Sequence, residues 1–102
     1  QSNVSGEIFN IGSGGTYSIH RLAALVGGPT VHIPKRPGEP DSTFADITKI
    51  RRLLGWNPRV SFTSGVKEML HRISDWSTAP VWTPESIATA TKEWFSHLAA
   101  PL

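Results

Sequence analysis

The sequence predicts a small α/β subdomain (a small α+β unit) in which short strands are combined with three to four helices. Three observations point to this class. A β-type run at residues 7–11 ends in a glycine loop and is followed by an amphipathic helix. A second short strand, residues 30–33, leads into a turn that contains proline and glycine. Later segments repeat apolar residues every three or four positions, which is the period of a helix with one buried face.

The first two predicted helices each begin at a polar cap and end at a glycine. Ser18 is placed to accept a hydrogen bond from the first turn of a helix over residues 19–26. Asp46 stands in the same position before a helix over residues 47–54. Glycine follows both segments, and glycine most readily takes the left-handed conformation that ends a helix.

Two more helices are predicted in the second half of the chain. The clearest amphipathic helix follows Ser61, with an apolar stripe from Phe62 to Ile73. After a proline-containing linker, Thr83 is expected to cap a last helix whose first residue is Pro84. The tail, residues 99–102, is expected to fray.

The chain has the length of one domain. A chain of 102 residues can bury roughly 60 to 65% of the surface that it exposes when unfolded. Residues 4–78 are expected to form the main subdomain, and residues 79–102 a C-terminal helical extension. Residues 1–3 look like the remnant of a cleaved expression tag, so the natural sequence is expected to continue from a larger N-terminal portion.

The composition argues against several classes of protein. The net charge of +2 comes from ten basic and eight acidic residues without a run of Lys or Arg, so no nucleic-acid partner is expected. The sequence has no cysteine, which excludes disulfides and thiolate metal sites and fits a reducing, cytoplasmic location. No apolar run approaches the ~18 residues of a membrane span, so no membrane partner is expected. The four histidines are scattered without helical spacing, so no metal site is expected.

The most informative segment is the turn Arg36-Pro37-Gly38-Glu39. Arginine offers a planar fork of donors that can meet a phosphate in two parallel hydrogen bonds. Pro37 fixes φ, Gly38 permits a sharp reversal, and Glu39 can accept from two vicinal hydroxyls at once. A pyrophosphate joined to a ribose would supply both partners. The alternative is a surface turn with an ion pair between Arg36 and Glu39 that is worth ~0.5 kcal/mol.

The glycine loop at residues 12–15 is a weak candidate for a second phosphate site. It lies between a predicted strand and a predicted helix, where backbone amides can bind phosphate. The dinucleotide fingerprint requires a third glycine that this loop lacks, and Lys35 and Arg36 stand where a ribose-binding acid would be expected. We therefore expect a plain strand-to-helix turn and no cofactor-binding residue in this chain.

Five segments of the sequence carry a resemblance to a known family. They are Phe9-Asn10-Ile11-Gly12-Ser13-Gly14, the helix start Ser18-Ile19, Arg36-Pro37-Gly38-Glu39, Ala45-Asp46-Ile47-Thr48-Lys49, and Leu54-Gly55-Trp56-Asn57-Pro58 with Phe62 and Gly65-Val66 after it. In this order and spacing, over about residues 7–76, they resemble the C-terminal part of the extended short-chain dehydrogenase/reductases. These are the NAD-dependent nucleotide-sugar epimerases and dehydratases, such as the UDP-glucose 4-epimerases.

The resemblance implies a role for each part of the chain. Residues 4–78 would be the subdomain of a Rossmann-type enzyme that holds the NDP-sugar. Arg36 matches the family's arginine on the diphosphate, and Glu39 matches an acidic residue, often Asp, that accepts from the nucleotide ribose. NAD and the catalytic Tyr-x-x-x-Lys pair belong to the family's N-terminal Rossmann domain, which is therefore an expected partner. The whole enzyme would be an isomerase or lyase, and its Rossmann part usually forms a homodimer.

The chain by itself is expected to be inactive and monomeric, without a catalytic residue. Its one tyrosine, Tyr17, is followed four residues later by Arg21 rather than by lysine. Two functions stay open: the sugar-nucleotide-binding part of an NAD-dependent epimerase or dehydratase, and a stand-alone module that binds nucleotides or a protein partner without chemistry. The base, the sugar, the choice between epimerisation, dehydration and decarboxylation, and the role of residues 79–102 also stay open.

Overall fold

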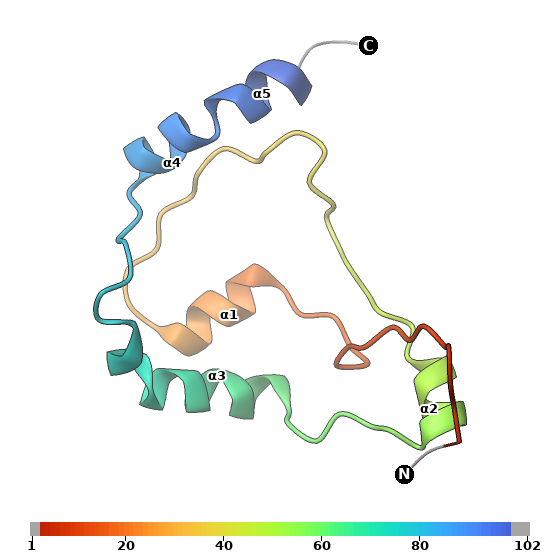
Figure 1. The fold of residues 1–102 in the computed structure, drawn as a ribbon. Coiled ribbons are helices and arrows are strands. Elements are labelled where there is room, and N and C mark those ends of the chain that lie inside the picture. The colour runs from red at the N-terminus through yellow and green to blue at the C-terminus, as the bar shows by residue number, and fades with distance from the viewer. Residues whose placement is uncertain (1–2, 99–102) are drawn as a thin grey trace.

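The computed structural model describes residues 3–98, in which short helices are joined by long irregular segments (Figure 1). The elements are α1 (Ile19–Val26), α2 (Thr48–Leu54), α3 (Phe62–His71), the 3-10 helix η1 (Ile73–Trp76), α4 (Pro84–Ala90) and α5 (Lys92–Leu98). Most of the expected tag remnant and all of the expected frayed tail lie outside the described residues. No helix within residues 3–98 has the length and apolar character needed to cross a membrane.

The two predicted strands run as irregular backbone. Residues 7–11 and 30–33 carry no strand assignment, and no backbone hydrogen bond pairs them with another part of residues 3–98. A strand exists only where a neighbouring segment completes its ladder of hydrogen bonds. The described part of the chain supplies no such neighbour, and the α/β class therefore stays a prediction.

Three of the four predicted helix caps are confirmed. The Ser18 hydroxyl accepts a hydrogen bond from the Arg21 amide at 3.1 Å. The Ser61 hydroxyl does the same for the Ser64 amide at 3.2 Å. Thr83 forms a reciprocal capping box with its third helical residue, and Pro84 is the first residue of α4. Each of these helices therefore begins where the sequence predicts.

Helix α2 begins one residue later than predicted. Ile47 is its N-cap, and the Asp46 carboxylate accepts a hydrogen bond from the Thr48 amide at 2.9 Å. Hydrogen bonds from Thr48 lower the pKa of Asp46, so the carboxylate is charged next to the positive end of the helix. At the other end, Gly55 takes the left-handed conformation, with φ of 62°, as the prediction of a glycine stop requires.

Two helices are shorter than the apolar pattern predicts. Helix α3 ends at His71, so Ile73 belongs to η1 and not to the α3 stripe. The last helix is interrupted at Thr91, between α4 and α5. The Thr91 hydroxyl donates to the Ile87 carbonyl at 2.8 Å, and this kind of back-bonding competes with the helix ladder and bends helices.

The buried core is small and lies around α2. Ile47 and Ile50 are each 4% exposed, and they are the buried apolar residues of the described chain. The N-terminal segment runs alongside α2 (Figure 1), where a Cβ added at Gly12 would lie only 2.6 Å from the Ala45 Cβ. Gly12 therefore allows the N-terminal segment to pack closely against Ala45. The buried core of the described residues is smaller than a chain of this length can form.

A second contact joins α1 to α3. The Tyr17 ring, just before α1, stacks on the Phe62 ring with centroids 4.3 Å apart and an interplanar angle of 6°. The Arg21 guanidinium lies over the same stack, 5.2 Å from the Tyr17 centroid. Tyr17 is thus held as a packing residue between the two helices.

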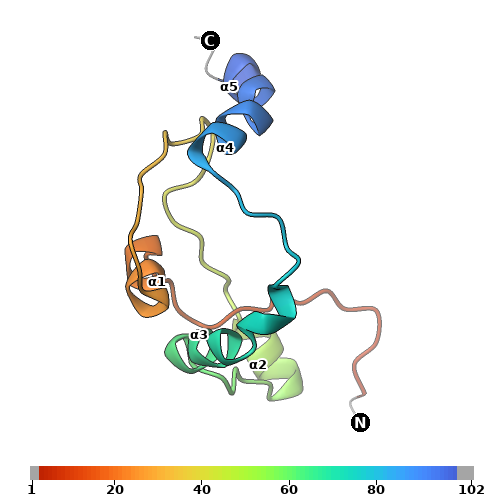
Figure 2. The ribbon, with the colours of Figure 1, turned by 90° about the vertical axis from the view of Figure 1, so that its left-hand side faces the viewer.

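The molecule is open rather than compact. Its radius of gyration is 18.4 Å, whereas a compact domain of 100 residues has about 13 Å. Figure 2 shows α4 and α5 at one end, α1, α2 and α3 at the other, and long connecting segments between them. Several large apolar side chains outside the helices face solvent, including Ile8 at 85%, Val31 at 70% and Phe44 at 65% exposure.

Candidate functional site

The structure brings the two predicted substrate-binding residues together on one tight turn. The Glu39 amide donates to the Arg36 carbonyl at 3.3 Å, and Gly38 adopts φ of 74°, which glycine tolerates without strain. The Arg36 Nη2 donates to Glu39 Oε1 at 2.8 Å, and Arg36 Nε donates to Oε2 at 3.3 Å. The side chains are 38% and 40% exposed, so both remain open to a ligand.

The ion pair keeps both groups charged. The hydrogen bond from Arg36 lowers the pKa of Glu39, and the nearby positive charges of Arg36 and Lys35 act in the same direction. The same bond raises the pKa of Arg36 above its ordinary value. An arginine carries five N–H donors. Glu39 engages two of them, which leaves three that a phosphate can accept.

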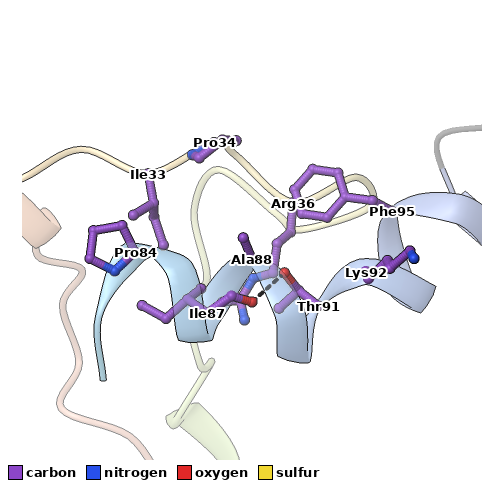
Figure 3. Close-up of a pocket in the computed structure, with 9 residues that line it drawn as sticks. All are labelled: Ile33, Pro34, Arg36, Pro84, Ile87, Ala88, Thr91, Lys92 and Phe95. Carbon is purple, nitrogen blue, oxygen red and sulfur yellow. Dashed lines mark hydrogen bonds between the residues drawn. The ribbon is translucent and has the colours of Figure 1, made fainter. Parts of the chain in front are cut away.

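The turn lies between two hollows of different character. Glu39 borders a hollow of about 650 Å³ whose other lining groups include Lys35, Ser42, Thr43 and the first residues of α1. This wall is rich in hydroxyl and charged groups. Arg36 borders the second hollow, of about 270 Å³, which is mainly apolar and lies between the turn and helices α4 and α5 (Figure 3).

The C-terminal helices pack directly on the turn. The indole Nε1–H of Trp94, in α5, donates to the carbonyl of Pro37 at 2.8 Å. The guanidinium carbon of Arg36 lies 5.3 Å from the centroid of the same indole ring. Trp94 could not be identified as a site residue from the sequence, which places it only on the apolar face of the last helix. Its separation of 57 positions from Pro37 left no local signal.

The glycine loop at residues 12–15 has a structural explanation. The Ser13 hydroxyl is bonded within the loop, to Gly15, and Gly14 packs near Ile47 and Arg51. Three residues separate the loop from α1, whose first turn is already capped by Ser18. The loop therefore does not present its amides at a helix N-terminus, where they could bind the phosphates of a dinucleotide.

The structure also brings two histidines together. His20 Nε2 and His32 Nε2 lie 3.4 Å apart, although they are twelve positions apart in the sequence. Within the described residues no group of three or more His, Cys, Asp or Glu side chains converges. A protein zinc site takes at least three such ligands, so this pair does not amount to one.

Comparison with known proteins gives a consistent result. Residues 17–69, just over half of the chain, match the family model described as GDP-mannose 4,6 dehydratase. The chain is 36% identical to a dTDP-glucose 4,6-dehydratase of Streptomyces niveus, in a match that covers 70% of the chain and 23% of the relative. It is 37% identical to UDP-glucuronic acid decarboxylase 2 of Arabidopsis thaliana, over 61% of the chain and 15% of the relative.

A third relative is a UDP-glucose 4-epimerase of Lactobacillus helveticus, 42% identical over 52% of the chain and 18% of the relative. The chain thus spans less than a quarter of the length of these curated relatives. No solved structure matches the chain significantly. The family match includes the Arg36 turn and stops before α4 and α5. By the extent of this match, the chain belongs to the GDP-mannose 4,6-dehydratase family of nucleotide-sugar epimerases and dehydratases.

Proposed function

We propose that this chain supplies the sugar-nucleotide-binding surface of an NAD-dependent nucleotide-sugar epimerase or dehydratase. NAD and the catalytic residues would be held by another part of the same protein. The observation that carries the proposal is the Arg36–Glu39 turn, which lies inside the region that matches the family. Its two charged groups suit the two linked groups of a nucleoside diphosphate.

The three N–H donors of Arg36 that Glu39 does not use would bind the diphosphate. Each Glu39 oxygen accepts one hydrogen bond from Arg36 and has a further lone pair for a hydroxyl. The carboxylate would thus accept from both hydroxyls of the ribose. The ion pair supports these two roles, Arg36 on the diphosphate and Glu39 on the ribose, because it orients both side chains before the ligand binds.

The substrates named for the relatives support the same class of ligand. The names include dTDP-glucose, UDP-glucuronic acid and UDP-glucose. These molecules differ in base and sugar but share a nucleoside diphosphate. Binding that shared part away from the reacting sugar would contribute energy that orients the sugar at the catalytic residues.

The exposed apolar segments support a partner within the same protein. Ile8 and Val31 belong to the two predicted strands, and both face solvent. We propose that a Rossmann domain covers these segments and supplies the neighbouring strands that their backbone lacks. This would also account for the predicted α/β class.

Arg36→Ala in the full-length protein tests the proposal. We expect the affinity for the tightest ligand among UDP-glucose, dTDP-glucose and GDP-mannose to fall by about 2 kcal/mol, or about 30-fold, because charge-assisted bonds to the diphosphate are lost. Isothermal titration calorimetry measures this directly. Arg59→Ala is the matched control, since Arg59 is exposed and lies in the connection before α3. Absence of binding to all three ligands, or equal losses in both variants, would contradict the proposal.

A further inference from the structure

We propose that Trp94 is a positioning residue for Arg36, so that the α4–α5 pair completes the sugar-nucleotide site. This inference rests on the proposed function and assigns a role to the helix pair α4–α5. It also concerns a part of the chain that the family match does not include. The role of Trp94 is to orient another side chain, without a contact to the ligand itself.

One side chain makes two contacts to the turn. The indole N–H donates to the Pro37 carbonyl at 2.8 Å and so fixes the backbone directly after Arg36. The ring lies against the guanidinium of Arg36, at 5.3 Å from centroid to carbon. Because the same residue holds both the backbone and the charged group, their relative orientation is fixed.

The contacts divide the guanidinium between two neighbours. Glu39 holds one edge through two hydrogen bonds, and the guanidinium carbon lies over the Trp94 ring. A free arginine side chain loses about 2 kcal/mol of rotamer freedom when it is ordered. If the protein orders it before the ligand binds, that loss does not weaken ligand binding. The remaining donors would then form a preformed phosphate site, which a ligand can reach because the Arg36 side chain is 38% exposed.

The hollow beside the turn is lined by apolar side chains from both the turn segment and the helix pair. Its walls come from Ile33 and Pro34 on one side and from α4 and α5 on the other, including Ile87 and Phe95 (Figure 3). Helix α5 also lies against the backbone of the turn, since a Cβ at Gly38 would be 3.6 Å from the Leu98 Cδ1. Apolar side chains of both parts thus face one another across the hollow, and Trp94 adds directional contacts to the turn.

A double-mutant cycle between Trp94 and Arg36 tests the inference in the full-length protein. UDP-glucose, dTDP-glucose and GDP-mannose are the probes, and calorimetry gives the affinity for the tightest of them. Trp94→Phe removes the N–H donor but keeps a ring, and we expect about 5-fold weaker binding. Trp94→Leu removes both contacts, and we expect about 20-fold weaker binding. In the Arg36→Ala background, both changes should weaken binding less than about 2-fold, because the group that Trp94 positions is gone.

Trp82→Phe is the matched control, because Trp82 is 61% exposed and precedes α4. A spectroscopic readout accompanies the cycle: the Arg36 Nε–H signal in the ¹⁵N spectrum of the 102-residue chain should shift in Trp94→Leu and not in Trp82→Phe. Equal losses with and without Arg36 would indicate a general folding role and overturn the inference. Normal binding by Trp94→Leu, beside weak binding by Arg36→Ala, would overturn it and leave the proposed function standing. Normal binding by Arg36→Ala would instead overturn the proposed function.

Discussion

Arg36 and Glu39 satisfy one another in the unliganded turn, and the same contact prepares both for a ligand. A carboxylate with a guanidinium on both oxygens holds its charge and its orientation, and it still has lone pairs to offer. The ion pair is half exposed, so its direct contribution to the stability of the chain is small. The ion pair contributes to the proposed site by holding the two side chains in a fixed orientation.

The pH dependence of the turn follows from the lowered pKa of Glu39. In the unfolded chain this carboxylate titrates near its ordinary value of 4.5, and in the folded chain it titrates lower. The ion pair therefore stabilises the turn above pH 4.5, and this contribution is lost as the pH falls through the folded pKa. A ¹³C NMR titration of the Glu39 carboxyl should give a midpoint below 4.5. Arg36→Ala should raise that midpoint and Arg59→Ala should leave it in place; an unmoved midpoint in Arg36→Ala would contradict the assignment.

Whether a contact in this site can be predicted depends on how far apart its two residues are in the sequence. Arg36 and Glu39 are three positions apart on a turn with proline and glycine, so their approach could be predicted from local geometry. Trp94 joins Pro37 over 57 positions, and only the folded chain defines that contact. The composition of the last helix indicates that it has an apolar face but not which segment the face will meet.

At the level of elements, the helix starts were predictable because they depend on one side chain and the amides next to it. Ser18, Ser61 and Thr83 each cap the helix that follows them. The ends of the apolar pattern predicted less well where each helix stops. Thr91 interrupts the last helix through its own hydroxyl, a local competition that hydrophobic periodicity does not report.

Alanine substitutions at two glycines, Gly12 and Gly65, should have opposite effects on stability and so test the packing around α2 and α3. An alanine at position 12 would put its Cβ 2.6 Å from the Ala45 Cβ, and we expect Gly12→Ala to destabilise the chain by about 1 to 3 kcal/mol. An alanine at position 65, inside α3, would meet Val60 at an ordinary 3.5 Å. Gly65→Ala should therefore stabilise the helix by about 0.5 to 1 kcal/mol. Urea unfolding followed by far-UV circular dichroism measures both, and a tolerated Gly12→Ala would show that the two segments are not in contact.

At the scale of the whole molecule, the predicted strands are the elements that do not form within residues 3–98. Residues 7–11 and 30–33 have the composition of strands, but a ladder requires a second segment beside each of them. Within residues 3–98 the small core around Ile47 and Ile50 does not bring such segments together. The strand prediction thus depends on a partner, whereas the helix predictions depend on the chain alone.

Hydrogen exchange can test whether the apolar segments gain that partner in the full-length protein. In the 102-residue chain, the amides of residues 7–11 and 30–33 have no backbone acceptor among the described residues, so we expect them to exchange nearly as fast as in an unfolded chain. In the full-length protein they should become at least about 100-fold slower, because strand pairing with a Rossmann domain would protect them. The amides of α1 and α3 are the internal control, since these helices already contact one another in the chain. Fast exchange of residues 7–11 and 30–33 in both proteins would mean that the exposed side chains of Ile8 and Val31 have no cover within the enzyme, and the proposed domain partner would have to be abandoned.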